Sequence, residues 1–134
     1  MKRQTIRIFA ALCCLLPLCA CHRTENRVGK VAESFLNVYY AGDYASAAAL
    51  CTPRLAALVG RGGESSDRIP EETAAKMKEA LSETSFQIVS VTVDEDAAFA
   101  RVCYELTAPG LGRPVPKTLR LQLEGRTALV DGIE

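Results

Sequence analysis

Hydrophobic periodicity changes from helical to alternating within this 134-residue chain, and that change limits the fold more than any other feature. Between residues 27 and 41, apolar side chains recur at steps of three and four, which is typical of an amphipathic helix. Between residues 117 and 124, leucines alternate with polar residues, which is typical of a strand with one buried face. Helices followed by an antiparallel meander predict an α+β fold.

Two helices are expected at the start of the domain. Gly42 follows the amphipathic segment 27–41 and is suited to ending it. Asp43 can cap the next helix, a run of small residues over 44–51 that could pack closely on a neighbour.

Proline and glycine residues predict the next boundaries. Thr52-Pro53 favours the start of a short helix that ends at Val59. We expect the glycine-rich stretch 60–69 to be a solvated connector, because it has neither the ending of a phosphate-binding loop nor a Gly-x-Ser-x-Gly motif. Pro70 then opens a helix over residues 70–83.

Alternating segments predict four strands, over residues 86–93, 97–107, 117–124 and 127–133. The alternation slips by one position between Ile88 and Val89, which indicates a β-bulge. Residues 94–96 are expected to form the first turn. The prolines and glycines of residues 108–116 predict a loop between the second and third strands.

The first 21 residues have the organisation of an export signal. Basic residues precede an apolar run of about 13 residues, which would form a helix of about 20 Å and is too short to cross a bilayer core of about 30 Å. The run ends in Leu18-Cys19-Ala20-Cys21, a sequence that resembles the lipobox of bacterial lipoproteins. The alternative is a plain secretory signal in which the cysteines occur by chance.

The lipobox resemblance implies a membrane anchor at Cys21. Its thiol would receive a diacylglycerol, cleavage after Ala20 would free its amine for a further acyl chain such as palmitate, and several chains together anchor stably. Because His22 is not aspartate, the resemblance further implies sorting to the outer membrane of a Gram-negative cell. The expected organisation is a signal peptide over residues 1–20, a lipidated tether over 21–26, and one domain over 27–134.

Removal of the signal changes the charge balance of the chain. The 16 basic and 16 acidic residues of the precursor become 13 and 16, a formal charge of −3. A mildly acidic domain lacks the basic surface that nucleic-acid binding requires. No second apolar run is long enough to span a membrane. We therefore expect a membrane partner through the lipid anchor and no nucleic acid.

Two cysteines, Cys51 and Cys103, remain beyond the anchor. A disulfide between them is allowed outside the cytoplasm. The strand alternation argues against it, because Cys103 is expected to face away from the apolar side of its strand, whereas Cys51 falls on the buried side of a helix. A disulfide and a pair of free thiols both stay open, because connectivity cannot be deduced from sequence.

Three segments resemble small bacterial lipoproteins of the nuclear transport factor 2-like, or cystatin-like, superfamily. These segments are VAESFLNVYYAGDYASAAALC, FQIVSVTVDEDAAFARVCYEL and KTLRLQLEGRTALVDGIE. The resemblance implies N-terminal helices packed on a curved antiparallel sheet of about four strands, with a pocket at its open end. Members of this kind often carry a tryptophan near Ala128, and this chain has none.

The candidates to line such a pocket are four tyrosines: Tyr39, Tyr40, Tyr44 and Tyr104. Tyr39 and Tyr104 fall on apolar faces, where a tyrosine is more often part of the core. The only histidine, His22, adjoins the anchor and cannot reach a pocket. No catalytic constellation, metal site or cofactor is expected, because histidine and cysteine are too few for metal-ligand spacing.

Three classes of function follow, in decreasing order of support. The first is a tethered, non-catalytic domain that binds a small ligand or an envelope protein. The second is a structural or accessory subunit of an envelope assembly. The third is a pocket-type enzyme, for which no site is apparent. Because function resides in sites and not in folds, the fold alone does not choose among them.

Overall fold

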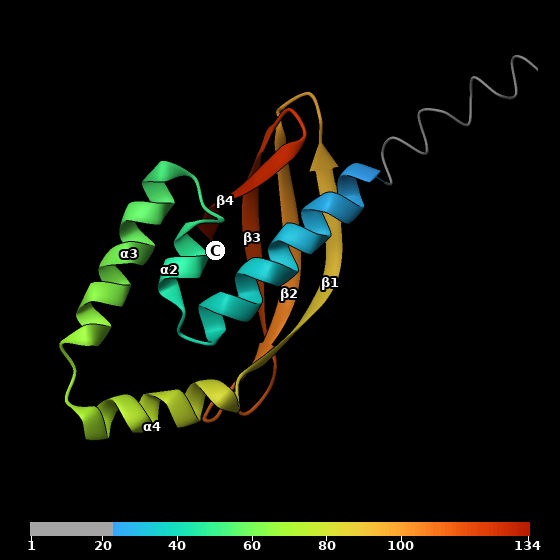
Figure 1. Cartoon of the computed structure of the whole chain (residues 1–134). Coiled ribbons are helices and arrows are strands. Elements are labelled where there is room, and N and C mark those ends of the chain that lie inside the picture. Colours follow the sequence, from blue (N-terminus) through green and yellow to red (C-terminus); the bar gives the residue numbers. More distant parts are fainter. Residues whose placement is uncertain (1–22) are drawn as a thin grey trace, which may run out of the picture.

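The computed structural model describes residues 23–134, so the lipobox, Cys21 and His22 lie outside the described residues. An N-terminal helix over residues 23–40 comes first. Three further helices follow: α2 (Tyr44–Ala48), α3 (Pro53–Asp67) and α4 (Glu71–Ser82). The strands are β1 (Ser85–Asp94), β2 (Phe99–Thr107), β3 (Val115–Glu124) and β4 (Thr127–Ile133). The α+β prediction is confirmed: N-terminal helices pack against a four-stranded antiparallel open sheet (Figure 1).

The sheet is a meander in the order β1-β2-β3-β4. Its register confirms the predicted bulge, because Ile88 pairs with Tyr104 while Ser90 pairs with the preceding residue, Cys103. The extra residue, Val89, is 61% exposed.

A second irregularity lies between β3 and β4, where Arg120 pairs with Gly132 and Leu121 pairs with Val130. Asp131 therefore has no direct partner in the ladder, and a residue displaced in this way can be re-aimed by its bulge.

The outer edge of β4 is covered by the connection between α2 and α3. Val130 donates its N–H to the carbonyl of Leu50 at 2.9 Å, and its own carbonyl accepts from the N–H of Thr52 at 2.8 Å. The two bonds form a parallel bridge between Cys51 and Val130, so Cys51 has left the helix. This pairing explains why α2 ends at Ala48, three residues before the predicted end at Cys51.

The core lies between the N-terminal helix and one face of the sheet. The helix contributes four fully buried residues at helical spacing, and the sheet contributes alternate residues of its three later strands. The fully buried residues of these two sets are Val28, Ala32, Phe35 and Leu36 from the helix, and Val102, Leu119, Leu121 and Val130 from the sheet.

The N-terminal helix begins earlier than predicted. Residues 23–26, expected to belong to a polar tether before the helix, are helical. Val28 is fully buried. The side chain of a helical residue lies over the turn that precedes it, so the turn before Val28 is part of the packed structure. The helix ends as predicted before Gly42, whose φ of 82° suits glycine.

The predicted connector over residues 60–69 is wrong, because α3 continues through it to Asp67. Each interior glycine costs about 1 kcal/mol relative to alanine, a penalty that packing can offset. A Cβ placed on Gly63 would lie 3.4 Å from the Tyr44 Cβ, so glycine permits α3 to pass close to the start of α2. Only residues 68–70 separate α3 from α4.

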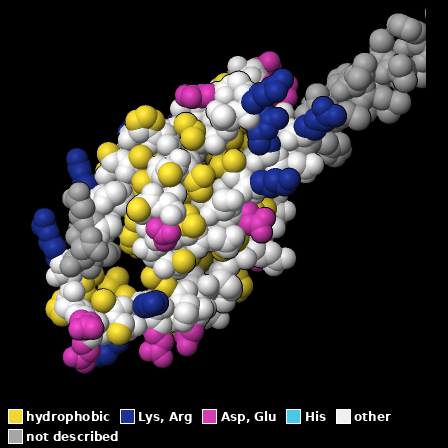
Figure 2. Space-filling view, in the orientation of Figure 1, with side chains coloured by type: hydrophobic (Ala, Val, Ile, Leu, Met, Phe, Trp, Pro, Cys, Tyr) yellow, Lys and Arg dark blue, Asp and Glu magenta, His cyan; other side chains and the backbone are white. Residues whose placement is uncertain are grey.

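The helix α4 stands away from the core. It begins within one residue of the prediction, but none of its side chains is buried. In Figure 1, α3 and α4 form an arch that returns the chain to the start of β1. The space-filling view in Figure 2 shows a hollow between this arch and the body, bordered by apolar side chains.

Candidate functional site

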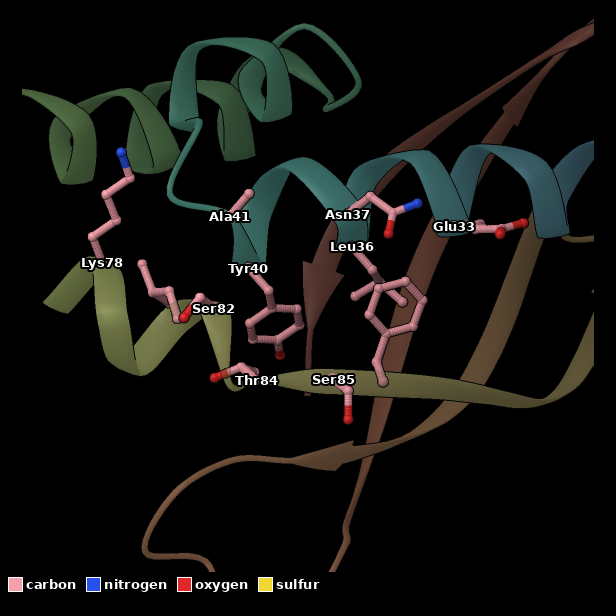
Figure 3. Close-up of a pocket in the computed structure, with 11 residues that line it drawn as sticks. Glu33, Leu36, Asn37, Tyr40, Ala41, Lys78, Ser82, Thr84 and Ser85 are labelled. Carbon is pink, nitrogen blue, oxygen red and sulfur yellow. The ribbon is translucent and has the colours of Figure 1, made fainter.

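The main cavity is a groove of about 620 Å³ between the N-terminal helix, the end of α4 and the start of β1 (Figure 3). Its apolar surface comes from Leu36, Tyr40, Leu81 and Phe86. Figure 3 shows Leu36 and Tyr40 pointing from the helix toward β1. The remaining lining residues are mainly polar: Glu33, Asn37, Ala41, Lys78, Ser82, Thr84 and Ser85. The groove therefore has an apolar floor and a polar rim.

Tyr40 connects this groove to the core. Its hydroxyl lies 3.0 Å from the hydroxyl of Tyr104, which projects from β2 and is 1% exposed. Burial raises the pKa of Tyr104, and its hydrogen bond with Tyr40 raises it further, so the buried phenol of Tyr104 stays neutral at neutral pH. The side chain of Tyr40 is thereby fixed in one direction within the groove.

The four candidate tyrosines form one cluster, but they do not line one cavity. The ring of Tyr39 lies 5.1 Å from that of Tyr40 and 5.7 Å from that of Tyr44, both edge-on, and it also stacks on Phe35. Burial raises the pKa of Tyr39, with smaller contributions from Tyr40 and Tyr44. Tyr40 lines the main groove, Tyr44 lines a second hollow, and Tyr104 lies beneath in the core.

The second hollow has a volume of about 200 Å³ and lies where the arch faces the body. It is bounded by Tyr44 and Gly42 on one side and by residues of α4 on the other, including Met77 and Leu81. Leu81 also lines the main groove, as do Ala41 and Lys78, so the two cavities adjoin at the end of α4.

One polar cluster was missed by the sequence reasoning. The carboxylate of Asp131, 8% exposed, accepts hydrogen bonds from Thr52 Oγ1 at 2.9 Å and from Arg120 Nη2 at 2.9 Å. Arg54 Nη2 donates to the Asp131 carbonyl at 2.7 Å. The hydrogen bond from Thr52 and the neighbouring arginines lower the pKa of Asp131. Its only sequence signal is an aspartate inside an otherwise apolar strand.

This cluster connects the helices to the sheet. Asp131 sits in the β4 bulge and reaches Thr52, the residue before α3, while Arg120 lies on β3 with its guanidinium 4.7 Å from the centre of the Phe99 ring. Asp131 lines neither of the two cavities, and its carboxylate is already hydrogen-bonded. The arrangement is that of a structural tie.

Other predicted residues have defined places. Asp43 caps α2 by accepting from the N–H of Ser46 at 3.2 Å, as predicted. Cys51 and Cys103 are both free thiols. Burial raises the pKa of the Cys51 thiol to about 11. Cys103 lies on the opposite side of β2 from the buried residues Val102 and Tyr104.

Within residues 23–134, no group of three or more histidine, cysteine, aspartate or glutamate residues is placed to hold a metal ion. None of the helices in the same range is both long and apolar enough to cross a membrane.

Comparison with known proteins gives no significant match: no family model, no curated protein and no solved structure matches this chain. The architecture is that of an α+β domain with helices followed by a four-stranded antiparallel sheet, and it is consistent with a cystatin-like arrangement.

Proposed function

We propose that this protein is an envelope lipoprotein whose domain binds a ligand or partner in the groove between the N-terminal helix and β1, without catalysis. The groove carries the proposal. Its volume of about 620 Å³ lies within the range of about 300–1,000 Å³ typical of ligand sites. Its apolar floor with a polar rim is also the usual chemistry of such sites.

The anchor in this proposal is Cys21. The lipobox Leu18-Cys19-Ala20-Cys21 supports lipidation, with the domain outside the cytoplasm and His22 favouring the outer membrane. The length of the N-terminal helix sets the distance between the anchor and the groove. Residues 23–40 span about 27 Å at 1.5 Å per residue. Because the groove adjoins the far end of this helix, an anchor at Cys21 would hold it away from the bilayer surface.

The same proposal assigns the domain to the nuclear transport factor 2-like superfamily. The order of helices and strands supports that assignment, as do the three segments that resemble lipoproteins of this kind. The groove would then correspond to the pocket that the resemblance implies.

The other two classes of function have less support. The outer face of the sheet is largely polar, with Arg101, Glu105 and Gln122 among its residues, so it offers no broad apolar contact for an assembly. The buried acid nearest to an arginine, Asp131, is outside the groove and engaged in structural hydrogen bonds. A binding role therefore agrees best with the groove.

Site-specific photo-crosslinking in intact cells tests the binding role. A photoreactive amino acid at Glu33, which lines the groove, should give a discrete adduct. The matched control is Ser34, the next residue of the same helix, which is exposed and lines neither cavity. Equal adducts at both positions, or none at either, would refute binding in the groove.

The anchor is tested separately with Cys21→Ser. Acyl labelling should disappear, and the protein should no longer be found in the lipoprotein fraction extracted from membranes. Unchanged acyl labelling would exclude Cys21 as the lipidated residue, while leaving the crosslinking result intact.

A further inference from the structure

The first strand has an open edge. Within residues 23–134, β1 pairs only with β2, and no backbone hydrogen bond joins its other edge to another segment. The opposite edge of the sheet is covered, because Val130 of β4 bonds to Leu50 and Thr52. A bare strand edge presents unpaired N–H and C=O groups to which another strand can add.

A line of hollows follows this edge. The main groove lies at the start of β1, and a middle hollow of about 450 Å³ lies beside Ile88 and Val91. Glu33 lines both of them. An end hollow of about 540 Å³ lies beside the end of β1 and shares Glu25 with the middle hollow. Together they form one trough between the N-terminal helix and the edge strand.

The floor of the trough alternates on either side of the bulge at Val89. Phe86, Ile88, Val91 and Val93 are half-buried on the helix side of β1, while residues between them are exposed. Each of the pairs Phe86–Ile88 and Val91–Val93 has the two-residue spacing of an extended strand, and the extra residue of the bulge keeps both pairs on the same face. A strand added to β1 would place every second side chain against the same apolar layer.

We propose that the trough binds an extended peptide segment of a partner protein, which adds to β1 as a fifth strand. The inference rests on the proposed binding function and names its partner class. The segment would alternate apolar and polar residues, with the apolar ones under the N-terminal helix. Recognition by strand addition takes affinity from main-chain hydrogen bonds and specificity from alternate side chains.

Charge gives the segment a direction. The trough ends at Asp94, Glu95 and Asp96, which line the end hollow. A basic residue at the corresponding end of the peptide would be attracted to these carboxylates, and an acidic residue would be repelled. The expected partner segment therefore has lysine or arginine next to its alternating stretch.

The test uses the full-length lipoprotein in detergent and a fluorescent synthetic peptide, Lys-Lys-Val-Thr-Val-Thr-Val-Thr-Val. Two modified peptides carry N-methyl groups on all valines or on all threonines. In an extended strand, alternate N–H groups point to opposite edges, so only one of the two modifications removes the bonds to β1. That peptide should bind about tenfold more weakly or worse, while the other retains its affinity.

Two protein variants provide the matched comparison. Val89→Lys places a charge on the open edge, a change that natural sheets use to prevent strand addition. Leu58→Lys makes the same kind of change on α3, where Leu58 is 52% exposed and far from the trough in sequence. Val89→Lys should weaken binding about tenfold and Leu58→Lys should not, with circular dichroism verifying that both fold.

Several outcomes would overturn the inference. Equal effects of the two methylation patterns would show that main-chain pairing is not used. Tighter binding of a peptide that starts with two glutamates would contradict the attraction of a basic end to Asp94, Glu95 and Asp96. A self-association that Val89→Lys abolishes would assign the edge to a second copy of this chain. Absence of peptide binding, with crosslinks at Glu33 still formed, would overturn strand addition and leave the proposed function standing.

Discussion

The hydroxyl groups of Tyr40 and Tyr104 lie 3.0 Å apart, and this contact joins the wall of the groove to the sheet beneath it. The two tyrosines differ in burial. Tyr104 is almost fully buried, whereas Tyr40 borders the groove and retains access to its interior. Removal of the Tyr40 hydroxyl should therefore lower the stability of the fold by a different amount from removal of the Tyr104 hydroxyl.

Tyr40→Phe should destabilise the protein more than Tyr104→Phe. The first change leaves a buried hydroxyl on Tyr104 without its partner, at a cost of about 1–3 kcal/mol. The second leaves a hydroxyl on Tyr40 that can turn toward water in the groove, at a cost of about 1 kcal/mol. Urea denaturation followed by circular dichroism measures both. The double variant should resemble Tyr104→Phe, and the reverse order of costs would show that Tyr40 is the more buried partner.

Asp131 should make stability fall in acid. Its pKa is lowered in the folded state, chiefly by the hydrogen bond from Thr52 and further by Arg120 and Arg54. Such a group stabilises the fold above its unfolded pKa of about 3.9, and that stabilisation is lost as pH falls through the lower, folded value.

Asp131→Asn should therefore lower the free energy of unfolding by about 1–3 kcal/mol at pH 7 and by less as the pH approaches 3. Both arginine side chains are partly exposed, 66% for Arg54 and 43% for Arg120, so most of the effect should come from the hydrogen bonds. Denaturation midpoints at pH 7, 5 and 3 give the comparison. Asp96→Asn, an exposed change in a turn, is the control. A deficit that stays constant with pH would mean that the charge of Asp131 is not responsible.

The two thiols should react at different rates. Cys51 is 6% exposed, its pKa is raised to about 11, and its Sγ lies 3.2 Å from the Ala47 carbonyl. Because the thiolate is the nucleophile, a raised pKa and burial both slow alkylation. In native protein at pH 8, iodoacetamide should modify Cys103 first and Cys51 only on unfolding. Peptide mapping by mass spectrometry separates the sites, and a disulfide-linked peptide would contradict the free pair.

Elements with local signals were predictable from the sequence. Alternation located all four strands and the bulge at Val89, since a period of two reflects one buried face. The cap at Asp43 and the turn at Gly42 also depend on neighbouring residues alone. Tertiary contacts decided the rest. The end of α2 is set by pairing of residues 50–52 with β4, which no local pattern encodes.

The candidate site was predictable only in part. The four tyrosines do come together, but their division between groove, second hollow and core depends on how the helices cross the sheet. Asp131 was missed because its partners Thr52 and Arg54 are more than 70 residues away in sequence, with separations of 79 and 77. Polar networks assembled across such distances leave no periodic signal.

Glycine substitutions test the corrected course of α3 directly. At Gly60, a Cβ would meet nothing within 4 Å, so Gly60→Ala should stabilise a continuous helix by about 0.5–1 kcal/mol. Gly42→Ala should act in the opposite direction, because Gly42 has a φ of 82° and its added Cβ would lie 3.3 Å from Leu81 Cδ1. Thermal and urea denaturation show whether each variant is more or less stable than the original protein. A neutral Gly60→Ala beside a destabilising Gly42→Ala would favour an irregular connector at residue 60, because helix propensity stabilises alanine over glycine only where the backbone is helical.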